Sequence, residues 1–318
     1  MEYRKIGKLD VSAIGLGCNQ LGTRCDADES RAIIHRALDL GITLFDTAEE
    51  YGNGNSEAVL GAALRGRRQQ AVIATKFAGF WQEAYSPGKA GATAITRSVE
   101  ASLKRLGTDY IDLYQLHFPD PDTPIDETLG ALEGLIRSGK VREIGCCNFS
   151  AEQIGDAANC AADMKTTPFA SAQNRFNLLR QEVAETVLPA CAAHGLAFLP
   201  YFPLAAGLLT GKYRIGEAPA ADTRMGSSYV APEVAAKVLR PEALGKVEHL
   251  RHFAAERGHT VATLAIAWLL ANPQVASVIA GATRSEQVAA NVQAGALPLD
   301  ASDAELAGEI GRGAPRQA

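Results

Sequence analysis

The chain has 318 residues, of which 47% are hydrophobic and 21% are charged, and its formal net charge is -5. This composition suits a globular protein with a sizeable core and excludes a disordered or fibrous chain. The negative charge gives no electrostatic reason to bind nucleic acid or an anionic membrane, and no apolar run approaches the roughly 20 residues needed to cross a bilayer.

The first residues lack the apolar segment of a secretion signal, so we expect a cytoplasmic protein. Six cysteines are scattered without C-x-x-C spacing. We therefore expect reduced, mainly buried thiols rather than a disulfide framework or a zinc site, and we predict no metal centre.

Strand and helix patterns alternate along the chain after a predicted N-terminal β-hairpin, whose arms are residues 3–6 and 11–14. Amphipathic segments with apolar residues at three- and four-residue spacing separate the strands and predict helices, for example over residues 30–40, 95–106 and 125–137. The predicted strands are 14–18, 42–47, 71–76, 110–117, 141–147, 170–175, 196–202 and 275–281.

Eight strands with helical spacers predict a parallel α/β architecture, either a closed (β/α)₈ barrel or an open doubly wound sheet. The open form would carry a G-x-G-x-x-G turn after its first strand. Here Gly15 and Gly17 are followed by a glycine only at position 22, which is too late for that motif. Residues 206–213 likewise miss the spacing of a phosphate-binding P-loop. We therefore predict a (β/α)₈ TIM barrel that forms a single domain over residues 1–318.

Three irregular stretches follow predicted strands on one rim of this barrel. Residues 78–92 follow the third strand, residues 118–124 the fourth, and residues 211–231 the seventh. A loop longer than ~15 residues in a compact domain is usually functional or disordered. Because active sites of such barrels lie at the carboxyl ends of the strands, we expect these loops to select the substrate.

Four polar side chains stand where predicted strands end. Asp46 and Tyr51 follow the second strand, Lys76 ends the third, and His117 ends the fourth. A tyrosine hydroxyl titrates near ~10, and a neighbouring ammonium group lowers that value. We therefore expect the lysine, held by the carboxylate, to make Tyr51 a usable general acid. His117 would hydrogen-bond a substrate carbonyl oxygen or assist the proton transfer. Since no side chain donates hydride, a nicotinamide cofactor would have to supply it.

Long motifs in a consistent order identify a resemblance over nearly the whole chain. The matching segments are residues 15–17, 45–52, 56–57, 60–61, 74–76, 110–117, 139–142, 144–145 and 148–150. Through them the sequence resembles the aldo-keto reductase family. The resemblance implies a (β/α)₈ barrel, NADPH-dependent reduction of an aldehyde or ketone, and a catalytic tetrad of Asp46, Tyr51, Lys76 and His117 with Tyr51 as proton donor.

The resemblance also implies a cofactor site. Asn148 and Gln173 would hydrogen-bond the nicotinamide carboxamide, and Tyr201 would stack on the ring. Arg284 is suited to grip a 2′-phosphate, which favours NADPH, although NADH stays possible and a solvated arginine in a first helical turn is the alternative. The implied cofactor-binding residues are Asn148, Gln173, Tyr201, Pro203, Leu204, Gly207, Leu208, Gly281, Thr283, Arg284, Gln287 and Asn291.

Cys147 departs from the family pattern, which commonly has serine before Asn148. A thiol is a poorer hydrogen-bond partner than a hydroxyl, so carboxamide binding would depend more on Asn148 and Gln173. A redox-sensitive thiol is the alternative, but we expect an inert, buried one. The candidate substrate-binding residues are aromatic, and they would either pack against an apolar part of the substrate or cover the barrel mouth. They are Phe77, Trp81, Tyr85 and Phe118.

Two other functions are open at this point. Lys76 at a strand end would suit a Schiff-base aldolase, although a cofactor-free aldolase has no reason to carry the cofactor segment 281–291. A cofactor-binding regulatory subunit, resembling the β subunits of voltage-gated potassium channels, is the second alternative. The sequence predicts a small-molecule carbonyl substrate without identifying it, and it does not predict the oligomeric state.

Overall fold

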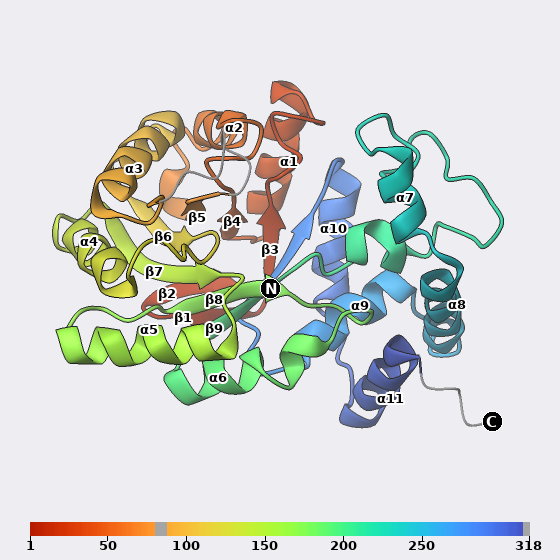
Figure 1. Ribbon diagram of the computed structural model, residues 1–318. Helices are drawn as coiled ribbons and strands as arrows, with labels where there is room; N and C mark the ends of the chain where they lie inside the picture. Colours follow the sequence, from red (N-terminus) through yellow and green to blue (C-terminus); the bar gives the residue numbers. More distant parts are fainter. Residues whose placement is uncertain (80–87, 314–318) are drawn as a thin grey trace.

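The computed structural model describes residues 1–79 and 88–313, and its centre is a parallel eight-stranded barrel surrounded by helices (Figure 1). The predicted (β/α)₈ barrel is thus confirmed. In their order around the sheet, the strands are β10 (Val278–Gly281), β3 (Ile14–Gly17), β4 (Leu44–Asp46), β5 (Val72–Phe77), β6 (Ile111–Leu116), β7 (Val141–Cys147), β8 (Ser171–Arg175) and β9 (Ala197–Tyr201).

Two seams close the barrel. The last strand, β10, pairs in parallel with the first, β3, from Val278 opposite Ile14 onward. On its other side, the Phe198 amide of β9 donates to the Gln274 carbonyl at 2.9 Å, and the Ala276 amide donates to the Phe198 carbonyl at 2.9 Å. Every barrel strand in the described part of the chain therefore has a neighbour on both sides, which rules out the open sheet.

The N-terminal hairpin consists of β1 (Tyr3–Ile6) and β2 (Leu9–Ser12). Its second arm was predicted two residues too late, because Ile6 pairs directly with Leu9 across a two-residue turn in which Gly7 has a φ of +54°. The apolar side chains of the hairpin form one cluster with residues near the starts of the barrel strands, so the hairpin covers the amino-terminal opening of the barrel.

The helices pack around the outside of the barrel, and several of them lie beyond it on one side (Figure 1). Two of them begin with capping boxes, Asp26 with Glu29 and Ser150 with Gln153, which fix where they start. The helices are α1 (Ala27–Asp39), α2 (Asn55–Ala63), α3 (Ala92–Leu106), α4 (Ile125–Arg137), α5 (Ala151–Met164), α6 (Val187–His194), α7 (Pro232–Val238), α8 (Pro241–Ala255), α9 (Val261–Leu270), α10 (Ser285–Ala294) and α11 (Ala301–Arg312), with short 3₁₀ helices at Arg68–Gln70, Glu182–Ala184 and Ala205–Thr210.

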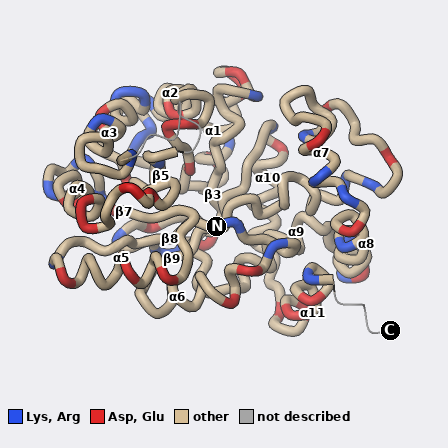
Figure 2. The backbone as a smooth tube through the Cα atoms, viewed as in Figure 1, with Lys and Arg blue, Asp and Glu red and all other residues tan. Residues whose placement is uncertain are grey.

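Apolar side chains between strands and helices form the main core, and a second cluster lies beneath α8, α9 and α11. Lys, Arg, Asp and Glu lie mainly on the outer helices and loops (Figure 2), and five of the eight barrel strands carry only one or two charged residues each, while β3, β9 and β10 carry none. Residues 211–231, called the irregular segment below, contain no helix or strand, as predicted, and α7 begins at Pro232. Among the residues that the structure describes, no helix is long and apolar enough to cross a membrane.

Candidate active site

The structure brings the four predicted catalytic side chains together at the carboxyl end of the barrel. Lys76 is at the centre. Its Nζ donates to Asp46 Oδ2 at 2.7 Å and to the Thr47 carbonyl at 2.9 Å, and it lies 3.4 Å from the Tyr51 hydroxyl. Lys76 is completely buried and Asp46 almost so. The carboxylate therefore balances a charge that has no access to water.

Burial and charge act in opposite directions on Lys76. Burial disfavours its ammonium form, but the adjacent Asp46 carboxylate, with smaller contributions from Tyr51 and Cys147, outweighs that effect and raises the pKa of Lys76 above its usual value. The side chain therefore stays a cation at neutral pH, fixed beside the Tyr51 hydroxyl.

Tyr51 differs from the sequence-based expectation. Part of its side chain faces a cavity, but burial withholds water from the hydroxyl and raises the pKa of Tyr51, and the opposing effect of Lys76 is smaller. The expected net lowering of this pKa by Lys76 is therefore wrong for this state of the protein, because desolvation exceeds the attraction between phenolate and ammonium. The hydroxyl holds its proton at neutral pH.

His117 is a neutral imidazole in this environment. Burial, and secondarily the positive charge of Lys76, lower the pKa of His117 well below its ordinary value. Its ring stacks on Phe118 at a centroid distance of 4.8 Å and meets the Tyr51 ring edge-on at 6.0 Å. Its Nδ1 lies 3.4 Å from Glu50 Oε1 without hydrogen-bond geometry. The ring is therefore held by packing, and its Nδ1 has no hydrogen-bond partner among the described residues.

A cavity of about 300 Å³ opens onto these side chains. Asp46, Tyr51 and His117 line it, and so do three residues predicted to hold the nicotinamide: Asn148, Gln173 and Tyr201. Sequence reasoning missed several other lining residues, although two of them, Cys18 and Phe202, directly follow a barrel strand. The missed residues are Cys18, Asn19, Glu50, Phe202 and Arg224.

The amide side chains in this cavity are tied to the tetrad. Asn148 Nδ2 donates to the His117 carbonyl at 3.0 Å, and Asn148 Oδ1 accepts from the Tyr201 hydroxyl at 2.8 Å. Gln173 Nε2 donates to Asp46 Oδ1 at 2.9 Å. Cys147 lies between them, and burial raises the pKa of its thiol to about 12, so the thiol is protonated and suits the expected inert role.

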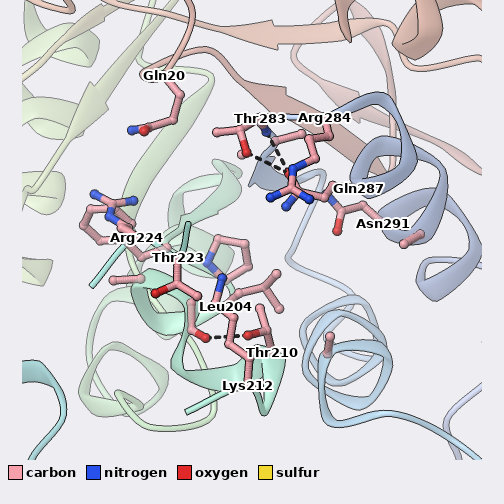
Figure 3. A pocket seen from close by; sticks show the side chains of 18 of the residues that line it. Gln20, Leu204, Thr210, Lys212, Thr223, Arg224, Thr283, Arg284, Gln287 and Asn291 are labelled. Atoms are coloured by element: carbon pink, nitrogen blue, oxygen red, sulfur yellow. Dashed lines mark hydrogen bonds between the residues drawn. The ribbon is translucent and has the colours of Figure 1, made fainter. Parts of the chain in front are cut away.

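A second cavity of about 500 Å³ adjoins the first. Both are lined by Asn19, Phe202, Pro203, Arg224 and Gly281, so the two cavities are immediate neighbours. Figure 3 shows how side chains from the β9 exit, the irregular segment and α10 surround the larger cavity. Of the predicted cofactor-binding residues, those that line it are Pro203, Leu204, Gly207, Gly281, Thr283, Arg284, Gln287 and Asn291.

Two predicted residues turn away from the cavities. Leu208 belongs to the second apolar cluster and is 6% exposed. Phe77 is a correction to the predicted substrate contacts, because its ring is fully buried and stacks on Tyr114 at 4.7 Å. Neighbouring residues of a strand point to opposite faces, and Lys76 takes the inward one. Phe118 does line the smaller cavity, whereas Trp81 and Tyr85 lie outside the described residues.

The backbone at the exit of β9 is strained beside both cavities. Phe202, Ala205 and Ala206 have φ values of +54°, +47° and +57°. Each such residue costs of the order of 1–3 kcal/mol, and strain of this kind clusters at functional sites. Hydrogen bonds hold the turn, because Asn177 Nδ2 and the Ala205 amide each donate to the Phe202 carbonyl at 2.9 Å.

The larger cavity is strongly cationic. Its charged lining residues are four cations and one acid: Arg24, Lys212, Arg224, Arg284 and Asp222. Sequence reasoning identified only one of the cations, Arg284. Arg24 follows strand β3, and Lys212 and Arg224 follow strand β9. Their position after barrel strands was the one sequence signal that pointed to the site. Such a cavity fits a ligand with several negative charges. Among the described residues, no group of three or more His, Cys, Asp or Glu side chains would hold a metal ion.

The fold is a (β/α)₈ barrel, and its site combines a buried lysine–carboxylate–tyrosine cluster with an adjacent cationic cavity. Residues 13–311 match the Aldo/keto reductase family, and the chain belongs to that family. Its members are oxidoreductases that act on small carbonyl substrates and generally use a nicotinamide cofactor.

Individual relatives cover almost the whole chain. Aldo-keto reductase YhdN of Bacillus subtilis (strain 168) is 37% identical over 315 residues, 95% of this chain and 91% of the relative. L-glyceraldehyde 3-phosphate reductase of Escherichia coli (strain K12) is 35% identical over 307 residues, 92% of this chain and 87% of the relative. A probable voltage-gated potassium channel subunit beta of Arabidopsis thaliana is 37% identical over 303 residues, 92% of this chain and 91% of the relative.

Proposed function

We propose that this protein is an NADPH-dependent reductase that converts an aldehyde or ketone into an alcohol, with Tyr51 as the proton donor. The observation that carries the proposal is the buried contact chain in which Asp46 holds the Lys76 ammonium 3.4 Å from the Tyr51 hydroxyl. Tyr51 and the neutral ring of His117 line the same cavity.

The residues present fit a dinucleotide phosphate. The two cavities adjoin, so an extended ligand that occupied both would reach from the cationic cavity to the tetrad, and their volumes fall in the range of small-molecule sites. Arg284 stands at the N-terminus of α10, where backbone amides and a guanidinium favour a phosphate group. When bound, the nicotinamide would supply hydride to the carbonyl carbon.

The side chains of the chain itself would handle the proton. A carbonyl oxygen in the smaller cavity would accept hydrogen bonds from the Tyr51 hydroxyl and from the neutral His117 ring, which polarises the carbonyl group. As negative charge develops on that oxygen, Tyr51 would transfer its proton to it. The Lys76 ammonium would then stabilise the phenolate, and Asp46 would keep the ammonium in place.

The test is Tyr51→Phe, with Tyr229→Phe as a matched control, because Tyr229 is 71% exposed on the irregular segment. The Tyr51 variant should keep NADPH binding, measured by fluorescence titration, and lose about 10²–10⁴-fold in kcat/KM for a carbonyl substrate. The control should match the wild type in both. Reduction of the carbonyl at the wild-type rate by Tyr51→Phe would refute the assignment of the proton donor.

A Schiff-base function for Lys76 is less well supported. The ammonium makes its contacts inside the protein and its pKa is raised, whereas a Schiff base needs an accessible neutral amine. Trapping of a carbonyl compound on Lys76 by borohydride would favour the aldolase, and NADPH oxidation without trapping would favour the reductase.

The likeness to plant proteins named as potassium channel β subunits favours a second candidate function, a cofactor-binding channel subunit. The tetrad and the cationic cavity would serve either function, so the assay must separate them. A panel of carbonyl compounds with NADPH does so: turnover supports the reductase, and NADPH binding without turnover on any compound supports the channel subunit.

A further inference from the structure

Asp222 is the one acidic side chain among the described residues that line the cationic cavity. It belongs to the irregular segment before α7, and its Oδ2 lies 3.6 Å from Arg284 Nη2 at the start of α10. Its backbone carbonyl accepts a hydrogen bond from Arg24 Nη2 at 3.2 Å. Asp222 therefore links two walls of the cavity, and its carboxylate contacts the Arg284 guanidinium that would also bind a phosphate group.

Arg284 projects from a fixed turn. Gln287 Oε1 accepts from the Thr283 amide at 2.7 Å and from the Thr283 hydroxyl at 3.2 Å, so the backbone that enters α10 is held (Figure 3). In Figure 3, Arg284 and Gln287 lie on one side of the cavity, and Thr223 and Arg224, which follow Asp222, lie on the other. The ion pair thus links the segment before α7 to the start of α10.

A phosphate group bound to Arg284 would compete with this carboxylate. A phosphate monoester carries about -1.5 to -2 charges at neutral pH, so a carboxylate on the same guanidinium repels it. A ribose 2′-hydroxyl has no such penalty, because it is neutral and can donate a hydrogen bond to a carboxylate. The same pair of side chains would therefore respond in opposite ways to NADPH and NADH.

We propose that Asp222 is a specificity-determining residue that weakens binding of a 2′-phosphorylated nicotinamide nucleotide at Arg284 and so lets the protein use the non-phosphorylated form as well. This inference rests on the proposed function, which assigns the cavity to a nicotinamide nucleotide. The Arg284 and Asp222 side chains are 62% and 74% exposed, so water screens their interaction and the effect is modest. Exposed pairs correspond to about twofold to fivefold in affinity.

The experiment measures binding by calorimetry with two probes that differ only in the 2′-phosphate, adenosine 2′,5′-bisphosphate and adenosine 5′-monophosphate. Asp222→Asn should bind the bisphosphate about twofold to fivefold more tightly than the wild type does and the monophosphate no more tightly. Glu217→Gln is the matched control, because Glu217 is an exposed acid on the same segment and is not among the described cavity-lining residues. It should change neither affinity.

Arg284→Ala should weaken binding of the bisphosphate and remove the effect of Asp222→Asn in the double variant. The ratio of kcat/KM for NADPH over NADH should rise in Asp222→Asn by the same factor as the bisphosphate affinity. Unchanged or weaker bisphosphate binding by Asp222→Asn, or an equal gain for both probes, overturns the role of Asp222 and leaves the proposed function intact. A wild-type protein that binds neither probe overturns the cavity assignment itself, and the inference with it.

Discussion

Replacement of Lys76 by methionine tests whether the buried ion pair stabilises the fold as well as the site. Methionine keeps most of the side-chain volume but leaves the Asp46 carboxylate buried at 3% exposure without its cation. Breaking a buried pair by removing one partner costs about 3–5 kcal/mol. With ~2.1 cal/mol/K of unfolding entropy per residue, 318 residues give ~0.7 kcal/mol per degree, so we expect Tm to fall by about 4 to 7 °C.

Differential scanning calorimetry of three variants checks this expectation. Lys5→Met is the matched control, because Lys5 and Asp10 form an ion pair at the same 2.7 Å distance but are 65% and 67% exposed. It should lower Tm by no more than about 1 to 2 °C. The double variant Asp46→Asn/Lys76→Met removes both charges and should recover most of the loss. Equal shifts for Lys76→Met and Lys5→Met would refute the reasoning, and so would a double variant less stable than the single one.

Two further predictions concern stability. Because the folded protein lowers the pKa of His117, the unfolded chain binds more protons below pH ~6.5, so acidification should destabilise the fold by up to about 1.4 kcal/mol per pH unit through this residue. His117→Gln should flatten the fall of the urea midpoint between pH 7 and 5, and an unchanged slope would contradict the low pKa. Gly61→Ala should lower Tm, since an added Cβ would lie 2.3 Å from the Leu106 carbonyl oxygen where α2 meets α3. Gly134→Ala, in α4 with no atom within 4 Å, should instead stabilise by about 0.5–1 kcal/mol, and calorimetric shifts of the same sign would contradict the packing argument.

The barrel was predictable because its signals are local. Strand β7 spans Val141–Cys147 as predicted, since a mainly apolar segment there is bounded by Gly139 and Asn148. Boundaries that depend on pairing were less predictable. Strand β10 begins at Val278 rather than at residue 275, because residues before it bond to β9 across the closing seam instead of extending the pairing with β3.

The grouping of the tetrad was also predictable, because its residues follow successive strands and such ends converge in a barrel. The pKa of Tyr51 was not, since desolvation depends on how tightly the surroundings exclude water. Asp222 and Arg224 were missed for a related reason. They lie far along a segment without periodicity, so its position after β9 does not indicate which of its residues reach the cavity.

The seam between β3 and β10 has a consequence for the timing of biosynthesis. The cationic cavity takes one wall from residues 19–24 and another from residues 281–291, and positions 24 and 281 are 257 residues apart. At a synthesis rate of ~5–20 residues per second, roughly 13 to 50 s pass between the two walls. During that interval β3 lacks its β10 neighbour and has an open edge for strand pairing. A nucleotide could then bind to the complete cationic cavity only after β10 has paired with β3.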